Sequence, residues 1–394
     1  MILGLAVLLA ATADNGTVVV GTAEELVAAV RSVADGQTIL ISDGAYDLPA
    51  SLWIEGKSHV TLTSASADAT KVILNGGGWD GGDPKDVIVI RGSDHVTISH
   101  LTIAEARLYG VKVEGVDGLP NPSEIHIDHC RFLDIGTRAV KGTATQDRNH
   151  MRGGSVRNCH FENTGTPGAD WLFDGDYVSS IDMMYLDGWT FADNDFRNIR
   201  GANGGGRGAI FIWNQSRRVI VERNRFVGCD RSIAFGNPSE PTNYEDGALH
   251  NYDGIIRNNV IVVGADKGIE LVWLENVLVA HNSIYCAIPT SRGIHAFQRV
   301  HGLRMLNNLV HGRVETEGDV VAEENIIGDL TDYFVDAEAG DLRLTDDAAD
   351  ALDAGSRIDE APDDIDGVPR GDRVDIGAHE RRQTHMGRST EESK

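Results

Sequence analysis

The chain has few basic residues, few cysteines and no long hydrophobic stretch, and each shortage excludes a class of protein. Its 394 residues hold 35 lysines and arginines against 60 aspartates and glutamates, a net charge of −25, so nucleic acid and anionic membrane surfaces are poor partners for the whole molecule. Four cysteines without CxxC spacing are too few for a disulfide scaffold and do not match a zinc motif. No apolar run reaches the roughly 20 residues that a membrane-spanning helix needs, so we expect no membrane insertion.

Glycine is abundant, whereas proline is scarce. The chain has 45 glycines and only 10 prolines, with 41% hydrophobic and 24% charged residues. The overall composition is typical of a globular protein with a large core. The glycine content indicates many tight turns at regular places, which is a reason to look for repeats.

The two ends of the chain differ from the rest. Residues 1–13 (MILGLAVLLAATA) form an apolar run closed by small residues, typical of the hydrophobic part and cleavage end of a secretory signal peptide, although the basic start is missing. This predicts a secreted, periplasmic or cell-surface protein; a misassigned start codon or a buried first strand are the alternatives. Residues 382–394 are polar and unpatterned, which predicts a disordered tail.

A six-residue pattern recurs through the middle of the chain. Each copy has an apolar residue, two polar or small positions, a fixed slot, a variable position and another apolar residue. The fixed slot is occupied in turn by Cys130, Cys159, Asn194, Asn224, Asn259, Asn282, Asn308 and Asn325. Asparagines stacked about 4.8 Å apart can hydrogen-bond along the stack and satisfy turn backbone groups inside a cylinder. The pattern therefore predicts a parallel β-solenoid with an asparagine ladder.

A second register precedes each copy of the pattern. A small residue is followed by an apolar one, and strand alternation then turns the next side chain outward. Successive coils contribute one outward column, which reads Lys112, Lys141, Asp182, Phe211, Ala234, Glu270 and His295. Two positions further along the same strands lie Glu114, Thr143, Met184, Trp213, Gly236, Val272 and Phe297, and beyond them Asn214, Asn237, Trp273 and Gln298. Ionisable groups, aromatic rings and amides are thus predicted to share one face.

These registers resemble those of right-handed parallel β-helix proteins of the type found among extracellular polysaccharide lyases, such as chondroitinase B and the alginate lyases. The resemblance extends over roughly residues 60–330, and residues 334–355 and 364–380 are similar to the C-terminal segment of many secreted β-helix proteins. It implies an all-β, single-stranded right-handed parallel β-helix. The predicted division is an N-terminal cap (14–60), the β-helix (61–330) and a C-terminal cap (331–381). Within the N-terminal cap, Thr22 and Glu25 would begin an amphipathic helix that closes the first coil.

The outward column suggests a chemistry for this face. Neighbours in the column lie about 4.8 Å apart. We therefore expect Lys112, Lys141 and Asp182 to form one contiguous group, and Glu270 and His295 to form a contiguous pair. The catalytic candidates are Lys141, Lys112, Arg138, Asp182, Glu270 and His295. Two adjacent lysines repel each other, which favours the uncharged form of one and attracts an anionic substrate. β-Elimination from a uronate needs a cation at the carboxylate, a base and an acid; we assign Lys141 as the base and Arg138 to the carboxylate.

A column of basic residues precedes the small residue of several coils. Together with the outward aromatic and amide residues it gives the substrate-binding candidates Trp213, Asn214, Asn237, Trp273, Gln298, Arg231, Lys267 and Arg292. An indole face matches the apolar face of a sugar ring, and a cationic rail can guide an acidic polysaccharide. The alternative is that the basic residues pair with nearby acids: Arg231 with Asp230 or with an acid of a neighbouring coil, and Lys267 with Asp266. Long loops at 145–153, 163–180 and 237–254 are predicted to wall the cleft.

Calcium is common in this class of protein, and the resemblance implies that Ca²⁺ could be bound here. Asp174, Asp176 and Asp182 are the candidate ligands, because calcium prefers several oxygens. The alternative is that Asp174 and Asp176 form a turn around Gly175. Lyases related to chondroitinase B and the alginate lyases place a Lys/Arg pair and a calcium-binding acid on adjacent coils, an arrangement that Lys112, Lys141, Arg138 and Glu114 partly imitate.

The sequence thus predicts a monomeric, exported polysaccharide lyase that cleaves an acidic, uronate-containing polysaccharide by β-elimination. One alternative is a glycoside hydrolase on the same fold, which needs two carboxylates about 5–10 Å apart. Asp182 and Glu270, three coils apart, would be about 14 Å from each other. The other alternative is a non-catalytic adhesin or glycan-binding protein. Cys130 and Cys159 occupy equivalent slots, and buried thiols are favoured over a strained disulfide.

Overall fold

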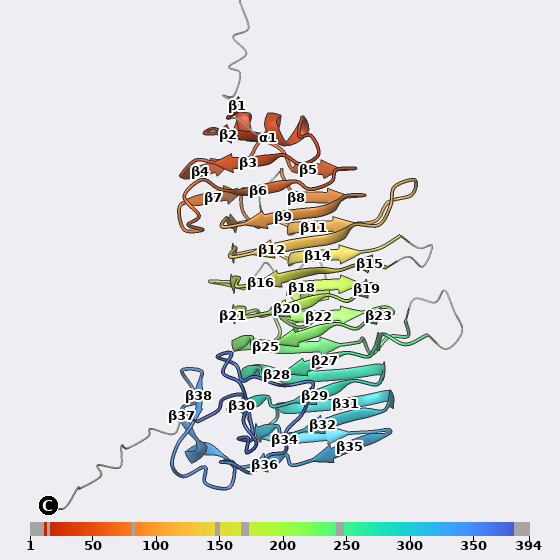
Figure 1. Ribbon diagram of the computed structural model, residues 1–394, viewed down its shortest axis with the longest axis vertical. Coiled ribbons are helices and arrows are strands. Elements are labelled where there is room, and N and C mark those ends of the chain that lie inside the picture. Colours follow the sequence, from red (N-terminus) through yellow and green to blue (C-terminus); the bar gives the residue numbers. More distant parts are fainter. Residues whose placement is uncertain are drawn as a thin grey trace, which may run out of the picture.

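The structure is a computed structural model that describes residues 12–13, 16–80, 83–145, 150–166, 173–241 and 248–381. The chain winds into a tall stack of coils that runs from the N-terminal helix at one end to the last strands at the other (Figure 1). Each coil adds strands to long sheets in which neighbours run parallel, as in a parallel β-helix. The predicted all-β solenoid is confirmed.

One sheet follows the asparagine side of the coils. In the described part of the chain its spatial order is β1 (Thr12–Ala13), β2 (Thr17–Val20), β3 (Thr38–Ile41), β6 (Thr61–Ser64), β9 (Asp94–Ser99), β12 (Ser123–Asp128), β16 (Gly154–Arg157), β20 (Thr190–Ala192), β24 (Ile220–Glu222), β27 (Ile255–Arg257), β29 (Leu278–Ala280), β32 (Leu303–Leu306) and β35 (Val320–Glu323). All of its pairings are parallel except that of β1 with β2.

The second sheet bends around the rest of each coil and has two main rows of strands. The row that carries the outward column consists of β5 (Leu52–Glu55), β8 (Asp86–Arg91), β11 (Tyr109–Glu114), β14 (Arg138–Thr143), β18 (Ser179–Met184), β22 (Ile210–Trp213), β25 (Arg225–Phe235), β28 (Val260–Glu275), β31 (Arg292–His301) and β34 (Arg313–Thr316). The other row contains β4 (Gly44–Asp47), β7 (Val72–Asn75), β10 (Thr102–Ala104), β13 (Arg131–Leu133), β17 (His160–Glu162), β21 (Asp195–Arg197), β30 (Ser283–Cys286), β33 (Leu309–His311) and β36 (Ile326–Gly328), and the long strands β25 and β28 span both rows. Short strands β15 (Met151–Arg152), β19 (Leu186–Asp187), β23 (Ser216–Arg217) and β26 (Asn251–Tyr252) complete the sheet.

The register of the outward column agrees with the sequence prediction. Strand pairing aligns Lys112, Lys141, Asp182, Phe211, Ala234, Glu270 and His295 one above the other. The apolar residues before them, from Val111 to Ile294, are buried in the core. Residues about thirty apart in sequence are therefore direct neighbours on the surface of one sheet.

The asparagine ladder is also confirmed. The side-chain amide of each ladder asparagine donates to the side-chain carbonyl of the next, over 2.8–3.0 Å, from Asn194 through to Asn325. Each of these carbonyls also accepts the backbone N–H of the preceding ladder residue. All four cysteines are buried free thiols, as expected, and the backbone N–H of Cys159 extends the ladder by donating to Asn194.

Replacing Asn259 by alanine is expected to destabilise the fold strongly. The change leaves the side-chain amide and the backbone N–H of Asn224 without their shared acceptor, and the buried carbonyl of Val221 without its donor. Each orphaned buried polar group costs about 1–3 kcal/mol, so the free energy of unfolding should fall by roughly 3 kcal/mol or more. The control is Asn75→Ala, which removes a solvent-exposed bond to Asp47. Denaturant unfolding measures the free energy of unfolding of both variants. If Asn259→Ala lost no more stability than Asn75→Ala, the ladder would add no stability of its own.

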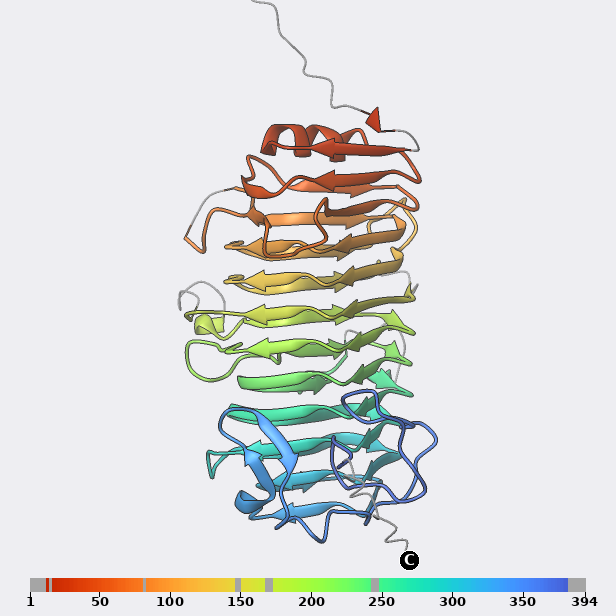
Figure 2. The same ribbon diagram turned by 60° about the vertical axis from the view of Figure 1, so that its left-hand side comes forward.

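The N-terminal helix α1 (Ala23–Arg31) begins as predicted. The hydroxyl of Thr22 accepts the backbone N–H of Glu25 at 3.2 Å, and the Glu25 carboxylate accepts the N–H of Gly21 at 2.9 Å. Leu26 and Val30 are buried against the first coil, and the helix lies across the end of the stack (Figure 2). The described residues contain no helix that is long and apolar enough to cross a membrane.

The C-terminal segment packs mainly against the flank of the last coils rather than across their end. It contains the short helix η2 (Thr331–Tyr333) and the hairpin β37 (Phe334–Asp336) and β38 (Asp341–Leu344). Its apolar side chains share a cluster with residues of β28, β30 and β33, and the blue trace in Figure 1 follows that side. Val321 and Ile327, on the last strands, each remain 47% exposed. The segment therefore covers an outer apolar face that the coils alone would leave open.

Candidate functional site

The centre of the outward column is a group of three charged side chains, the Arg138–Lys141–Asp182 cluster. They belong to the adjacent strands β14 and β18. One carboxylate oxygen of Asp182 accepts from Nε of Arg138 at 2.6 Å; the other lies 3.0 Å from Nζ of Lys141 and accepts from the indole of Trp213 at 3.0 Å. Arg138 and Asp182 are fully buried, whereas the Lys141 side chain keeps 11% of its surface exposed. Lys141 is thus the charged group that this cluster presents at the surface.

The charge state of Asp182 follows from two opposing effects. Burial alone would raise its pKa, but the charges of Lys141 and Arg138 outweigh burial and lower the pKa to about 2. Asp182 is therefore a carboxylate throughout the physiological range and cannot serve as a proton donor. It can hold the Lys141 side chain in place and stabilise its positive form.

Arg138 is in a different position from the one we expected. Its guanidinium lies 3.6 Å from the ring centroid of Tyr177 and donates to the backbone carbonyls of Thr137 and Tyr177. No part of the side chain is exposed, because the loop before β18 covers it. The expected direct contact of Arg138 with a substrate carboxylate is corrected accordingly: the side chain anchors Asp182 from below.

A groove of about 640 Å³ opens beside the cluster at the ends of β11, β14, β18 and β22. It is lined by Gly115, Val116, Asp117, Thr143, Ala144, Thr145, Met184, Tyr185, Trp213 and Asn214. Thr143 and Met184 lie two positions beyond Lys141 and Asp182 on the same strands, so they share the outward face of the sheet. Trp213 links the two features, because it lines the groove and bonds to Asp182. Two of the predicted substrate-binding residues, Trp213 and Asn214, are thus at the groove.

Lys112 precedes Lys141 in the column but has acidic partners of its own. Its Nζ is 2.7 Å from Glu114 and 4.0 Å from Asp86, and Glu114 also pairs with Arg91. Lys141 is likewise compensated by Asp182. Repulsion between the two lysines, on which we based the expectation of an uncharged lysine, is therefore offset by these carboxylates.

The predicted cationic rail is neutralised by acidic neighbours. Arg231 lies 2.8 Å from Glu270 and 2.6 Å from Asp266, and Lys267 contacts the same two carboxylates at 3.0 and 2.8 Å. Arg292 is 2.6 Å from Glu315. The alternative interpretation, pairing with nearby acids, is the one that the structure shows. Glu270 is buried in this network, which makes it a structural partner of Arg231 and Lys267.

His295 lies at the far end of the column from Lys141. Its ring stacks on Phe297 at 4.3 Å, and Nε2 is 3.8 Å from Glu315. Burial, followed by the charges of Arg292 and Lys267, lowers the pKa of His295. Five strand spacings, about 24 Å, separate it from Lys141 along the column. The expected pair of Glu270 and His295 is therefore remote from Lys141.

The remaining predicted sugar-binding residues lie on the later coils. The indole of Trp273 donates to Gln298 at 3.3 Å, and the guanidinium of Arg299 lies over its ring at 4.8 Å. The side chain of Asn237 accepts the backbone N–H of Ser239. None of these residues lines the groove beside Lys141.

His250 is an important residue to which the sequence pattern assigned no role. Its Nδ1 accepts the backbone N–H of Asn214 at 3.1 Å, and its Nε2 lies 2.9–3.0 Å from the carbonyls of Asn237 and Ser239. The ring contacts Trp213 edge-on, and burial lowers its pKa to about 4. The neutral imidazole therefore fixes the end of β22 and, with it, one wall of the groove. It belongs to a loop outside the repeat, and so no register marked it.

The three carboxylates predicted to bind calcium do not form a suitable set of ligands. Asp176 accepts the backbone N–H groups of Asn203 and Gly205, and the carbonyl of Asp174 accepts the Asn203 amide. Asp182 has both oxygens engaged by Arg138, Lys141 and Trp213. Among the residues that the structure describes, the three acids do not converge on one point. The oxygen atoms of Asp174, Asp176 and Asp182 thus fit roles in loop and cluster structure better than a calcium site.

Comparisons with known proteins identify the family and the fold. Residues 82–310 match the family model for the right-handed beta helix region, so the chain belongs to that family. Among solved structures, alginate lyase from Paenibacillus sp. str. FPU-7 is 18% identical (TM-score 0.54, 78% of this chain and 98% of that one). Pectate lyase Pel9A is 14% identical (0.60, 90% and 90%), and XylC in complex with xylose is 11% identical (0.55, 89% and 94%). No curated protein sequence matches the chain.

Because these sequence identities are low, the likeness to the solved structures establishes a shared fold and nothing more specific. The chain is a right-handed parallel β-helix, and polysaccharide lyases are among the proteins built on the same fold. The resemblance inferred from the ladder and the registers is confirmed.

Proposed function

We propose that the protein is a polysaccharide lyase that cleaves a uronate-containing polysaccharide by β-elimination in the groove beside the Arg138–Lys141–Asp182 cluster. The observation that carries the proposal is the buried Arg138–Asp182 pair, which holds the amine of Lys141 on the outward face of β14, the strand whose Thr143 lines a groove of about 640 Å³. The fold shared with alginate and pectate lyases supports the same class of reaction.

The roles of the residues follow from their contacts. In its uncharged form Lys141 removes the proton beside the uronate carboxylate, and Asp182 stabilises the ammonium that results. Arg138 keeps Asp182 ionised and in place. Lys112, one coil away and 25% exposed, is the cation we assign to the substrate carboxylate in place of Arg138.

A proton is also needed for the departing glycosidic oxygen. Tyr109 lies on the same strand as Lys112, and the Lys112 ammonium is 5.8 Å from its ring centroid. Burial is the main cause that raises the pKa of Tyr109 to about 12, so its phenol stays protonated and available as a donor. The C–H electrons then form the new double bond while the C–O bond breaks, and no hydrolytic water is consumed.

The protein is exported and acts on a substrate outside the cell. The apolar segment 1–13, which lies mostly outside the described residues, supports export, and an extracellular acidic polysaccharide is the corresponding substrate. Trp213 and Asn214 are the groove residues we assign to sugar contact.

The test is incubation of the protein with alginate, pectate and chondroitin, each with Ca²⁺ and with a chelator. A lyase produces unsaturated uronates, seen as ultraviolet absorbance, and products one water lighter by mass than those of hydrolysis. Products without the double bond would identify a glycoside hydrolase, and binding without cleavage a glycan-binding protein; either result would overturn the proposal.

A further inference from the structure

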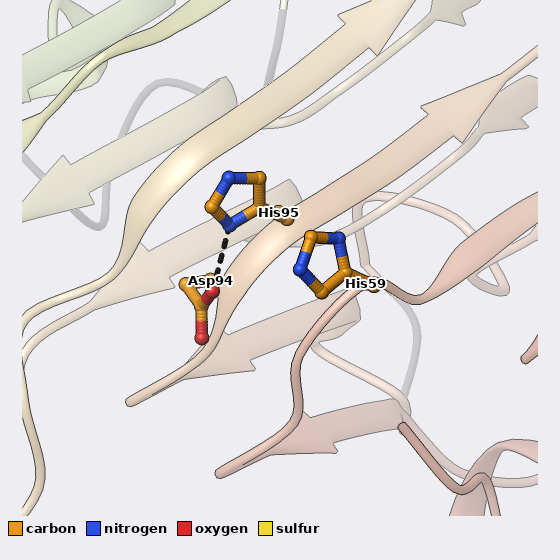
Figure 3. A group of neighbouring side chains, drawn as sticks. All are labelled: His59, Asp94 and His95. Atoms are coloured by element: carbon orange, nitrogen blue, oxygen red, sulfur yellow. Dashed lines mark hydrogen bonds and ion pairs between the residues drawn. The ribbon is translucent and has the colours of Figure 1, made fainter. Parts of the chain in front are cut away.

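Two histidines and an aspartate meet at an outer corner of the first coils, on residues to which the proposed reaction gives no role. They are His59, just before β6, and Asp94 and His95, at the start of β9 (Figure 3). Their ligand atoms all lie within 4.8 Å of one another. Within the part of the chain that the structure describes, this is the one group of three or more His, Cys, Asp or Glu side chains whose ligand atoms lie this close together.

The backbone of the β-helix brings these residues together. His59 and His95 have φ angles of 58° and 52°, a left-handed corner repeated on successive coils. The register of β6 with β9 aligns the two histidines, and the backbone N–H of His59 donates to the carbonyl of Asp94 at 3.1 Å. Their rings stack with centroids 4.3 Å apart. The separation of the rings is therefore fixed by strand pairing rather than by flexible loops.

The side chains are already arranged as ligands. Nδ1 of His95 lies 2.7 Å from Asp94, whose carboxylate also accepts from the Ser58 hydroxyl at 2.9 Å. Figure 3 shows one ring nitrogen of His59 turned toward the Asp94–His95 pair. In a tetrahedral zinc site with bonds of about 2.0–2.1 Å, ligand atoms are about 3.3 Å apart. The two imidazoles are exposed and can turn through the remaining distance.

We propose that His59, Asp94 and His95 form a surface site for a divalent transition metal, with Zn²⁺ as the fitting ion. Imidazole nitrogens suit Zn²⁺, Cu²⁺ and Ni²⁺, whereas Ca²⁺ and Mg²⁺ prefer oxygen ligands. Two nitrogens and one carboxylate supply three of four tetrahedral positions, and the fourth faces solvent. This site is independent of the groove and of the proposed elimination reaction.

The molecule contains a matched comparison at another corner. His100, His129 and Asp128 repeat the same residue types, with His129 Nδ1 2.9 Å from Asp128 and the two rings 5.0 Å apart. Those rings are nearly parallel, at 8° against 28° for the first pair, and the ligand atoms of His100, Asp128 and His129 do not all lie within 4.8 Å of one another. Asp128 is also bonded to the Asn158 amide. Composition alone therefore does not distinguish the two corners, but geometry does.

The test is titration of the untagged full-length protein with ZnCl₂ against a chromophoric chelator, comparing His59→Asn, His95→Asn and His100→Asn. Asparagine tolerates the left-handed backbone at all three positions while removing the imidazole. We expect one Zn²⁺ per chain, affinity reduced roughly tenfold or more in the first two variants, and no change in the third.

A second readout identifies the ligands directly. Cu²⁺ bound to the wild-type protein should show electron paramagnetic resonance couplings to two imidazole nitrogens, and one coupling should be lost in His59→Asn. The proposal is overturned if no ion binds, if the His59→Asn/His95→Asn double variant binds as tightly as wild type, or if His100→Asn is the variant that loses affinity. None of these outcomes depends on lyase activity.

Discussion

Replacing Lys141 by methionine is expected to lower kcat for elimination by about 10²–10⁴-fold, the usual contribution of a positioned general base. Methionine fills a similar volume but cannot accept a proton. The fold should survive, because Asp182 keeps its bonds to Arg138 and Trp213. The KM should change little, since the walls of the groove are formed by other residues.

Two further variants separate the base from a simple positive charge. Lys141→Arg retains the charge but not a readily deprotonated amine, so it should be nearly as slow as Lys141→Met. Lys71→Met removes an exposed lysine whose carboxylate partner is 3.9 Å away, and it should match wild type. Initial rates of unsaturated uronate formation show whether Lys141 acts as a base or only as a positive charge. If Lys141→Arg retains most of the activity, Lys141 acts as a cation and the assigned base is wrong.

Replacing Arg138 by methionine is expected to lower the free energy of unfolding by about 3–5 kcal/mol. The change leaves the fully buried Asp182 without the guanidinium that donates to it at 2.6 Å. In the double variant Arg138→Met/Asp182→Leu no buried carboxylate is left uncompensated. The double variant should therefore lose less free energy of unfolding than the sum of the losses in Arg138→Met and Asp182→Leu. Denaturant unfolding of the four proteins gives the coupling; additive losses would contradict the assignment of Arg138 as the anchor of Asp182.

The same pair predicts a pH dependence. The pKa of Asp182 is lowered from 3.8 to about 2 in the folded protein, chiefly because Lys141 and Arg138 outweigh burial. The resulting stability is fully present above about pH 4 and is lost as pH falls toward 2, an effect of about 2 kcal/mol. Asp182→Asn should therefore show a shallower loss of stability in this window than wild type.

The repeat made the fold and the column predictable from the sequence. The ladder asparagines, such as Asn224 and Asn259, must occupy the same turn in successive coils. The small–apolar pair before Lys141 or Asp182 fixes which side chain points outward. These features depend on strand period and stacking alone. The order of residues in the column could therefore be derived without coordinates.

What a side chain contacts depended on parts of the chain that do not repeat. The burial of Arg138 comes from Tyr177, in a loop of irregular length. The pairing of Arg231 with Asp266 and Glu270 depends on how far long side chains reach across neighbouring coils. His250 belongs to no register. Sequence could thus place charges on one face but could not determine which of them face solvent.

The most direct measurement is the crystal structure of the Lys141→Met variant soaked with uronate tetrasaccharides prepared from alginate and from pectate. We predict that the sugar lies in the groove between Gly115 and Trp213, with the carboxylate and the adjacent C–H of one uronate against residue 141. A sugar bound instead beside Glu270 and His295, or none bound in the groove with either tetrasaccharide, would contradict it.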